Sequence, residues 1–373
     1  MVQGMKQLSY KVRFVTPAFL GNAFQKGQWR TPPFKALLRQ WWRVVKAPEV
    51  DYNEDELRKK EALLFGSASD KGEFASEKSK VLLRLRHWQE GNIDSLDWKK
   101  LRFQQVTTTR SERGTVRSDI YLGFGPVLPP STKEGRRSIK LNTPPAINAG
   151  QEATLEVRID SDKDSAIREV ENALKLIHWF GTLGARSRNG WGSVQMVPLD
   201  GTPHISELSS SSFSGLTRDF GDCLKLCWPH AIGKDEKGPL VWRTKKRFKD
   251  WPEAFDFLAK LKVMVRRDAK TKKREGGFIG GIHLLGYPAG GKWEVSQWDG
   301  MRFACPLRFK VFKDGNGFSS LIFLMSCTIP EMLTDKLKPV DKDWLSNNQL
   351  EIWKDIHKAI DKCVDISRLV EVN

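Results

Sequence analysis

The segment 181–192, which reads GTLGARSRNGWG, carries residue types that suit a sugar–phosphate chain. Glycine permits backbone conformations that are closed to other residues and lets a second backbone come close. Guanidinium groups pair with phosphate, N–H groups in a concave loop hold anions, and aromatic rings accept stacked bases. The segment therefore predicts a loop that binds nucleic acid through Arg186, Arg188, Asn189 and Trp191. The alternative is an ordinary turn whose arginines are solvated.

Two common phosphate-binding motifs are excluded for this segment. A Walker A loop needs Gly-Lys-Ser/Thr after its glycines, and no such residues follow here. The dinucleotide fingerprint opens a helix, whereas this segment follows an apolar helical pattern that ends at Phe180. The sequence therefore predicts no nucleotide cofactor, and no other cofactor is expected.

A predicted helix near the start of the chain combines a basic face with one exposed ring. Thr31 suits its N-cap and Pro32 its first turn. An apolar face at about 3.6 residues per turn is formed by Phe34, Leu37, Leu38, Trp41, Val44 and Val45. At about 100° per residue, the other side collects Lys35, Arg39, Trp42, Arg43 and Lys46. Such a surface could follow a single strand, with cations for phosphates and Trp42 for a base. The alternative is a solvated helix face with a partly buried tryptophan.

A third basic segment lies between two predicted strands, Phe103 to Thr109 and Asp119 to Phe124. It contains Arg110 and Arg113 together with a glycine. We expect it to form a hairpin tip that reaches toward the same ligand.

The composition favours a polyanionic partner. The 373 residues include 62 Lys and Arg against 45 Asp and Glu, which gives a formal charge of +17. Such a balance is most often found in proteins that bind nucleic acid. A hydrophobic content of 39% and 14 tryptophans argue for packed cores and against disorder. A basic protein kept soluble by its charge is the alternative.

Cysteine usage and hydropathy indicate a reduced, cytoplasmic protein. The five cysteines are widely spread and odd in number, which does not fit a disulfide framework. Cys223, Cys227 and His230 lack the second pair that a zinc site needs, so no metal site is predicted. The sequence shows no signal peptide and no apolar run near the roughly 20 residues that span a bilayer, so no membrane partner is expected.

The first 205 residues predict one α+β domain. A strand at Leu8–Phe14 precedes the basic helix, and a second strand and helix precede the glycine-rich segment. The order strand, helix, two or more strands, helix, strand is that of a ferredoxin-like, RRM-like βαββαβ unit. Residues 48–100 are interpreted as an insertion and 126–145 as a loop.

A second, less regular round of elements follows a serine-rich linker at 206–220. We expect a strand at Cys223–Trp228, a helix at Trp251–Val265, and a final helix at Leu345–Leu369. Six cations at 266–274 and the glycine-dense turn 276–281 follow the first of these helices. The whole chain is therefore predicted to be two tandem ferredoxin-like domains with insertions, the second at 221–373.

The sequence resembles a known protein family in its element order and in several short segments. The predicted element order, the glycine-rich loop after the second helix and the segment Thr16–Gly21 (TPAFLG) are similar to the RAMP superfamily of CRISPR RNA-binding proteins. Within it, the block Arg30–Arg43 (RTPPFKALLRQWWR) and the later Met301–Leu307 (MRFACPL) are similar to the first subunit of the type III-B (Cmr) effector complex.

The resemblance implies a non-catalytic subunit that binds guide RNA and target single-stranded RNA in antiviral defence. Its partners would be other Cmr subunits, and it would sit near the 3′ side of the guide. Carried over by position, the RNA surface would include Arg30, Lys35, Arg39, Trp42, Arg43 and Lys46 with the arginines of the loops.

Three alternatives remain open from the sequence. RAMP relatives include ribonucleases that process guide RNA with a catalytic histidine, for which His87, His178 and His283 are candidates. Metal-dependent cutting of target RNA would need a loop aspartate, for which Asp119 is the candidate. A scaffold whose basic surface meets an acidic protein is the third.

Overall fold

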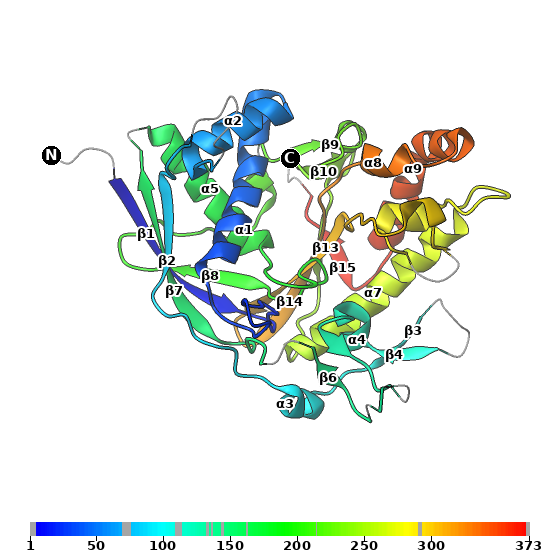
Figure 1. Ribbon diagram of the computed structural model, residues 1–373, viewed down its shortest axis with the longest axis horizontal. Helices are drawn as coiled ribbons and strands as arrows, with labels where there is room; N and C mark the ends of the chain where they lie inside the picture. The colour runs from blue at the N-terminus through cyan, green and yellow to red at the C-terminus, as the bar shows by residue number, and fades with distance from the viewer. Residues whose placement is uncertain are drawn as a thin grey trace. The chain divides into compact units, whose positions relative to one another are not determined.

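The computed structural model describes residues 5–68, 76–108, 114–131, 134–135, 137–142, 145–161, 163–213, 215–289 and 293–370. Arg110 and Arg113, two of the candidate RNA-binding residues, lie outside the described residues. The chain divides into two compact units (Figure 1). The first comprises Met1–Leu101, Gly125–Leu216 and Lys310–Lys313, and the second comprises Arg102–Phe124, Thr217–Phe309 and Asp314–Asn373. The expected boundary near 206–220 lies close to the change from Leu216 to Thr217, but Arg102–Phe124 belongs to the second unit.

The first unit is built on a four-stranded sheet with antiparallel neighbours. Its strands are β1 (Met5–Phe14), β2 (Val81–Leu85), β7 (Glu152–Asp160) and β8 (Val194–Pro198), in the order β2-β7-β1-β8. Leu8, Tyr10, Val12 and Phe14 are buried and alternate with more exposed residues, as their period of two predicted. The sheet therefore has one face turned to a core.

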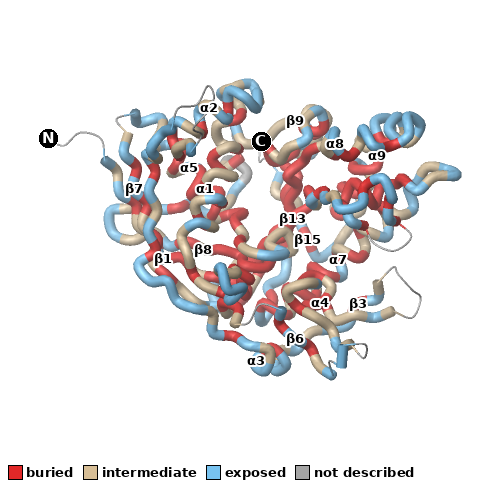
Figure 2. Tube along the Cα trace, viewed as in Figure 1, coloured by how far each residue is buried: buried red, intermediate tan, exposed pale blue. Residues whose placement is uncertain are grey.

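Helices α1 (Thr31–Lys46) and α5 (Asp164–Phe180) cover one face of this sheet (Figure 1). Trp41 of α1 packs on Phe180 of α5, with ring centroids 5.6 Å apart. Burying each large apolar side chain contributes about 1.5–3 kcal/mol, so the apolar faces of the two helices fix them on the sheet. In Figure 2 the buried residues follow the strands and the inner sides of the helices.

The segment 48–100, expected as an insertion, contributes a strand to the sheet. Its residues Val81–Leu85 form β2, which pairs with β7. The additional material is η1 (Ala47–Val50) and α2 (Glu54–Phe65) before β2, and α3 (Ser95–Lys100) after it. Shorter elements of this unit are β5 (Val127–Leu128), β6 (Lys140–Leu141) and η2 (Ser210–Phe213).

The second unit repeats the same alternation of elements. In chain order its elements are β12 (Val241–Thr244), α7 (Trp251–Thr271), β13 (Leu307–Asp314), β14 (Gly317–Leu324), α9 (Pro339–Asp361) and β15 (Ile366–Arg368). Of β13, residues Lys310–Lys313 are counted with the first unit. The sheet order is β13-β14-β12-β15. In both units the first strand therefore lies between the third and the fourth. The α+β class predicted from the sequence is confirmed.

Smaller elements complete the second unit. A three-stranded sheet has the order β11-β10-β9, and β3 pairs with β4 next to α4. Their bounds, with those of the remaining helices, are β3 (Gln105–Thr107), β4 (Thr115–Arg117), α4 (Ser118–Gly123), β9 (Thr217–Asp219), α6 (Phe220–Cys223), β10 (Ile232–Asp235), β11 (Gly238–Pro239), η3 (Gly281–Leu285), η5 (Ser296–Trp298) and α8 (Glu331–Thr334). No helix in the described part of the chain is long and apolar enough to span a membrane.

Three predicted elements are wrong. The expected strand at Asp119–Phe124 is helix α4, whose first residue, Ser118, donates a hydrogen bond to Asp256 of α7. No strand forms at Cys223–Trp228: Cys223 ends the short helix α6, and residues 224–228 turn and bend. Helix α6 begins where the Asp219 side chain accepts two backbone N–H groups. The final helix ends at Asp361, and the next residues turn back as β15 to complete the sheet.

Candidate nucleic-acid interface

The glycine-rich loop joins α5 to β8 and packs closely on the segment that follows β1. Gly192 donates its N–H to the carbonyl of Pro17 at 2.8 Å, and Ala185 donates to Phe19 at 3.0 Å. Gly192 has a φ of +61°, and a Cβ placed there would lie 1.9 Å from the carbonyl oxygen of Leu183. Glycine is required at this position because the backbone is left-handed and another backbone is in contact.

Trp191 anchors this loop and does not present its ring to solvent. The residue is 0% exposed, and its ring centroid lies 5.2 Å from that of Phe19 and 5.5 Å from that of Trp98. The expectation that Trp191 offers a platform for a base is therefore wrong. The ring packs into the core beneath the loop.

The cations of the loop are placed at its outer side. Arg186 is exposed and has a φ of +58°, an uncommon conformation for a residue with a side chain. Arg188 and Asn189 are half-buried. Their role in RNA binding stays a prediction, which the position of Arg186 supports.

Trp42 is also buried, contrary to the expected exposed ring. It is 1% exposed, its Nε1 donates to Glu169 of α5 at 2.9 Å, and its ring contacts Phe65 of α2. The prediction was wrong because α2 and α5 both cover the side of α1 that the periodicity left for solvent.

The arginines of α1 are paired with one buried carboxylate. Nε of Arg39 and Nε of Arg43 lie 2.5 and 2.6 Å from the carboxylate of Glu61 of α2. Burial opposes ionisation of Glu61, but hydrogen bonds and charge from the two arginines outweigh it and lower its pKa. With Arg58 these groups line an open hollow of about 670 Å³, into which the two arginines remain 38% and 42% exposed.

The other cations of this face are engaged to different degrees. Lys46 is paired with Glu169 at 2.8 Å and with Glu49 at 2.5 Å. Nζ of Lys35 donates to Ser79, and burial followed by the charge of Arg39 lowers the pKa of Lys35. The basic stripe expected on α1 is thus largely neutralised by carboxylates.

Arg30, directly before α1, differs from these cations. Its Nε is buried and has no hydrogen-bond partner in the part of the chain that the structure describes. A buried donor without a partner costs about 1–3 kcal/mol, which a bound acceptor would recover.

The pairing of Arg39 and Arg43 with Glu61 predicts an asymmetry between two variants. Replacing both arginines by alanine leaves a carboxylate that is 4% exposed without its partners, and we expect the free energy of unfolding to fall by about 3 kcal/mol. Glu61→Gln leaves two arginines that solvent reaches, and we expect a loss of about 1 kcal/mol. Urea unfolding followed by tryptophan fluorescence measures both.

Equal losses for the two variants would contradict the assignment of Glu61 as the buried partner. The asymmetry also bears on RNA binding. Loss of binding in the double alanine variant must be separated from loss of structure, for which Arg39→Lys with Arg43→Lys is the matched control.

An exposed ring occurs in a loop that the predicted site did not include. Phe24 is 83% exposed at the tip of a turn closed by the pairing of Gly21 with Gly27. The Asn22 side chain accepts the N–H groups of Phe24 and Lys26 at 2.9 and 3.0 Å, which holds the turn in shape. The signal in the sequence was an aromatic residue and a lysine between two glycines, GNAFQKG.

The Phe24 turn, the glycine-rich loop and Arg30 lie at one end of the first sheet, here called the loop end. Phe14 at the end of β1 pairs with Val194 at the start of β8, so the segments after Phe14 and before Val194 must meet there. Ala185 donates to Phe19 in the same region. The segment after β2 joins them, because Trp29 donates to the carbonyl of Gln89, next to the 55% exposed Trp88.

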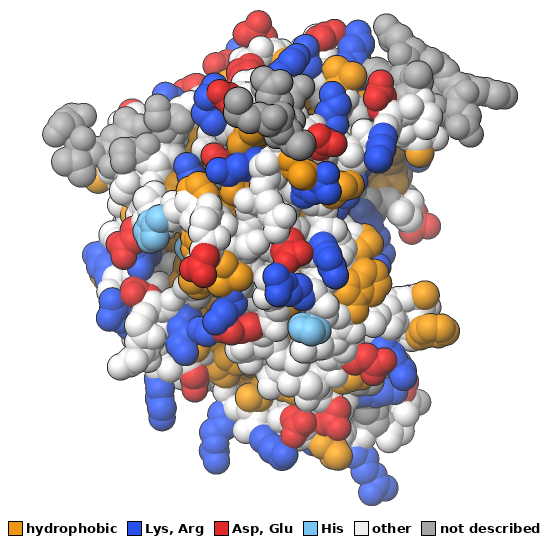
Figure 3. Space-filling view, turned by 90° about the vertical axis from the view of Figure 1, so that its left-hand side faces the viewer, with side chains coloured by type: hydrophobic (Ala, Val, Ile, Leu, Met, Phe, Trp, Pro, Cys, Tyr) orange, Lys and Arg blue, Asp and Glu red, His pale blue; other side chains and the backbone are white. Residues whose placement is uncertain are grey.

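Figure 3 shows one face of the molecule, on which Lys and Arg are interspersed with Asp and Glu. The formal charge of +17 therefore does not reduce to a single uniform patch on this face.

The residues considered for ribonuclease chemistry are mostly packed. Burial, then the charge of Lys310, lowers the pKa of His178 to about 4, and its Nδ1 contacts the Met196 backbone. His283 is fully buried against the carbonyl of Trp293, and burial lowers its pKa. Asp119 is buried and paired with Arg117 at 3.0 Å, while His87 is exposed. Among the described residues, no group of three or more His, Cys, Asp or Glu could hold a metal ion.

Comparison with known proteins gives a family and several solved structures. No curated protein sequence matches the chain. It is similar to a crystal structure of Cmr1 from Pyrococcus furiosus in the apo form, with 15% identity over 92% of this chain and 97% of that one and a TM-score of 0.45. It is also similar to a chain of the type III-B Cmr-beta complex bound to cognate target RNA, with 13% identity over 90% of this chain and 100% of that one and a TM-score of 0.47.

A chain of a type IV-B CRISPR complex is similar to 54% of this chain over 94% of its own length, with 12% identity and a TM-score of 0.31. The model of the RAMP superfamily matches residues 11–195, which span the sheet of the first unit up to the start of β8. Through these residues the chain belongs to the RAMP superfamily, as its sequence predicted.

Proposed function

We propose that this protein is a non-catalytic subunit of a type III-B (Cmr) CRISPR effector complex that binds single-stranded guide or target RNA. Membership in the RAMP superfamily supports an RNA-binding role. The block Arg30–Arg43 and the segment Met301–Leu307, which are similar to the first Cmr subunit, support the assignment to this complex.

The observation that carries the proposal is the composition of the loop end. It brings the exposed ring of Phe24, the exposed Lys26 and Arg186, and the buried Nε of Arg30 to one end of a rigid sheet. Cations neutralise phosphates and a ring stacks on any base, so such a surface binds single strands with little dependence on sequence. This chemistry suits a subunit that must accept any guide.

The fold supports the same assignment in finer detail. Each unit has the element order βαββαβ, and in each the first strand lies between the third and the fourth. We regard both as variants of the ferredoxin-like fold, which presents loops and strand ends to RNA in many binding modules.

The absence of catalysis is part of the proposal. His178 and His283 are buried with lowered pKa values, so they are poor acids or bases for RNA cleavage at neutral pH. Asp119 is paired with Arg117 and lies beneath the surface. Incubating the protein with labelled guide precursor and target RNA, with and without Mg²⁺, tests this directly, and intact RNA is expected in both.

The loop end gives a prediction for RNA binding. Phe24→Ala is expected to weaken binding of a 20-nucleotide single strand by about 1–3 kcal/mol, roughly 5- to 150-fold, whereas Phe24→Tyr keeps the ring and the affinity. Lys26→Gln combined with Arg186→Asn removes two phosphate contacts. Because each contact contributes about 0.7 to the slope of log K against log salt, the steepness of that slope is expected to fall by about 1.4. Asparagine is chosen because it tolerates the left-handed backbone of Arg186.

Filter binding across a salt series measures both effects. Lys163→Gln is the matched control, because this exposed lysine precedes α5 at the opposite end of the same sheet. The loop end is ruled out as the RNA surface if Lys163→Gln weakens binding as much as the Lys26 and Arg186 variant does.

A further inference from the structure

A second concentration of cations occurs at the C-terminal end of α7, in the second unit. Six of the nine residues 266–274 are basic and one, Asp268, is acidic. Lys272 is paired with Asp355 at 2.7 Å and Arg274 with Asp341 at 2.6 Å, both on α9. These two pairs hold the end of α7 and the residues that follow it on α9.

The remaining cations line an open hollow of about 500 Å³. Arg267 on α7 and Lys273, which follows the helix, are exposed and form no ion pair within the described residues. Lys270, in the last turn of α7, also lines the hollow. Arg266, by contrast, donates to the carbonyl of Ala289. The hollow thus collects positive charge that no carboxylate of its lining offsets, since Thr271, Gly277, Phe278 and Trp293 complete it.

An exposed aromatic ring stands at the edge of this hollow. Phe278 is 72% exposed on a short hairpin in which Lys273 pairs with Gly280 and Arg274 donates to the carbonyl of Ile279 at 3.0 Å. Gly276 turns the chain with a φ of +65°. A Cβ at Gly277 would lie 2.5 Å from Nε of Arg274, so glycine lets the guanidinium pass under the turn.

A second aromatic residue that lines the hollow, Trp293, is held in place by its neighbours. Trp293 is 9% exposed, and its carbonyl lies 2.8 Å from Nε2 of the fully buried His283. A buried aromatic residue, a protruding ring and two exposed cations, Arg267 on α7 and Lys273 just after it, are the parts that hold a nucleotide: phosphates on the cations and a base on the ring. An acidic protein would use the cations but would leave Phe278 without a reason to face solvent.

We propose that this hollow is a second binding site for single-stranded RNA, with a base stacked on Phe278 and phosphates held by Arg267 and Lys273. The site lies in the second unit, outside residues 11–195, and deepens the proposed function because it assumes an RNA ligand.

The test uses the full chain and a 30-nucleotide uridine-rich RNA containing 4-thiouridine. Photocrosslinking followed by peptide mapping is expected to label the peptide with Phe278 as well as a peptide of the loop end. Two variants are expected to weaken binding by about 10-fold each and to remove the crosslink to the peptide with Phe278: Arg267→Gln combined with Lys273→Gln, and Phe278→Ala alone. Phe278→Tyr is expected to retain both the affinity and this crosslink. Lys336→Gln with Lys338→Gln changes two exposed lysines of the same unit and is the control for net charge.

The outcomes separate this site from the proposed function. Crosslinks at the loop end alone, with full binding in the Phe278→Ala variant, overturn the second site and leave the proposed function in place. Crosslinks at Phe278 alone support the second site and rule out the loop end as an RNA-binding surface. Polyglutamate that competes as well as RNA identifies an acidic protein as the ligand and overturns the inference. No RNA bound by the wild-type chain overturns both proposals.

Discussion

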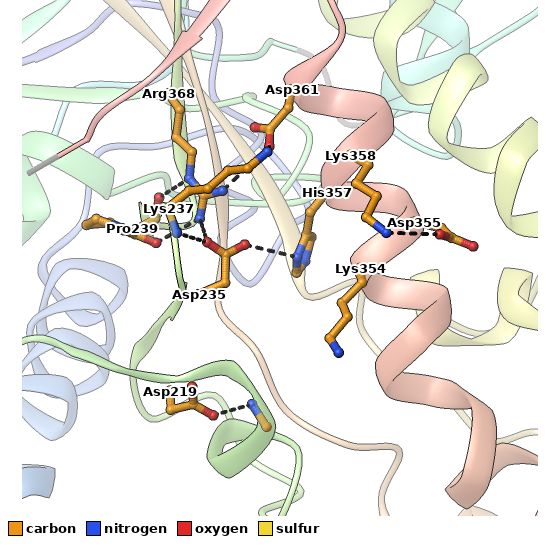
Figure 4. A network of polar contacts seen from close by, with 12 residues as sticks. Asp219, Asp235, Lys237, Pro239, Lys354, Asp355, His357, Lys358, Asp361 and Arg368 are labelled. Carbon is orange, nitrogen blue, oxygen red and sulfur yellow. Dashed lines mark hydrogen bonds and ion pairs between the residues drawn. The ribbon is translucent and has the colours of Figure 1, made fainter.

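Replacing Arg368 by leucine is expected to lower the free energy of unfolding by about 3–5 kcal/mol, the usual cost of breaking a buried ion pair. The side chain is 6% exposed and lies 2.5 Å from Asp235 and 3.6 Å from Asp361 (Figure 4). It also donates to the carbonyls of Gly238 and Pro239 at 2.7 and 2.9 Å. Leucine fills the space but leaves the two carboxylates without their shared cation.

Because of the position of Arg368 in the sheet, its replacement is expected to destabilise the packing of several elements. The residue belongs to β15, a strand of three residues that pairs with β12 at the edge of the sheet. Nε1 of Trp242 on β12 donates to Asp361 at 2.6 Å, and its ring lies 5.4 Å from the guanidinium. The network thus ties the last strand to α9 and to β12, and lysine cannot replace the planar guanidinium that makes four of these contacts.

Urea unfolding measures the effect, with Lys237→Ala as the control. Lys237 is 54% exposed and lies 3.2 Å from the same Asp361, so its loss is expected to cost less than about 1 kcal/mol. A cost below that level for Arg368→Leu as well would mean that the hydrophobic contacts of α9 suffice to hold β15.

The sequence predicted those elements whose own residues decide their structure. The alternation Leu8–Phe14 and the spacing of Phe34, Leu37 and Trp41 are local patterns, and each needs only one buried face to be interpretable. The helix at Ser118–Gly123 is different. Six residues are too few to distinguish the period of a helix from that of a strand. The helix is instead held by a contact of Ser118 with Asp256, which lies 138 residues away.

The candidate site was predicted less well than the fold, for a related reason. Periodicity places Trp42 outside the apolar face of α1, but it cannot show that Glu169, 127 residues later, accepts its N–H. Likewise nothing near Arg43 in the sequence announces that Glu61 neutralises it from a second helix. Cations and rings could be located by residue type, whereas their exposure depends on elements that only the folded chain brings together.

The glycine-rich loop is the part of the candidate site that the sequence predicted best, because its glycines indicate a left-handed or closely packed backbone without reference to distant residues. Gly192→Ala is expected to lower the free energy of unfolding by about 2–5 kcal/mol: about 1–2 for the left-handed backbone and 1–3 for the contact. The φ of Gly192 is +61°, and the new Cβ would lie 1.9 Å from the carbonyl oxygen of Leu183. This oxygen is backbone, so no side-chain rotation relieves the contact.

Gly201→Ala is the matched control for this prediction. Gly201 has a φ of +75° but has nothing within 4 Å of the position of a Cβ, so alanine there should cost only the left-handed backbone, about 1–2 kcal/mol. Equal costs at the two glycines would show that the loop moves away from Leu183 without penalty. The N–H of Leu183 donates to the carbonyl of Gly192, and the N–H of Gly192 donates to Pro17. Because these bonds set the path of the chain that carries Arg186, the same Gly192 variant is expected to weaken RNA binding even under conditions in which it remains folded.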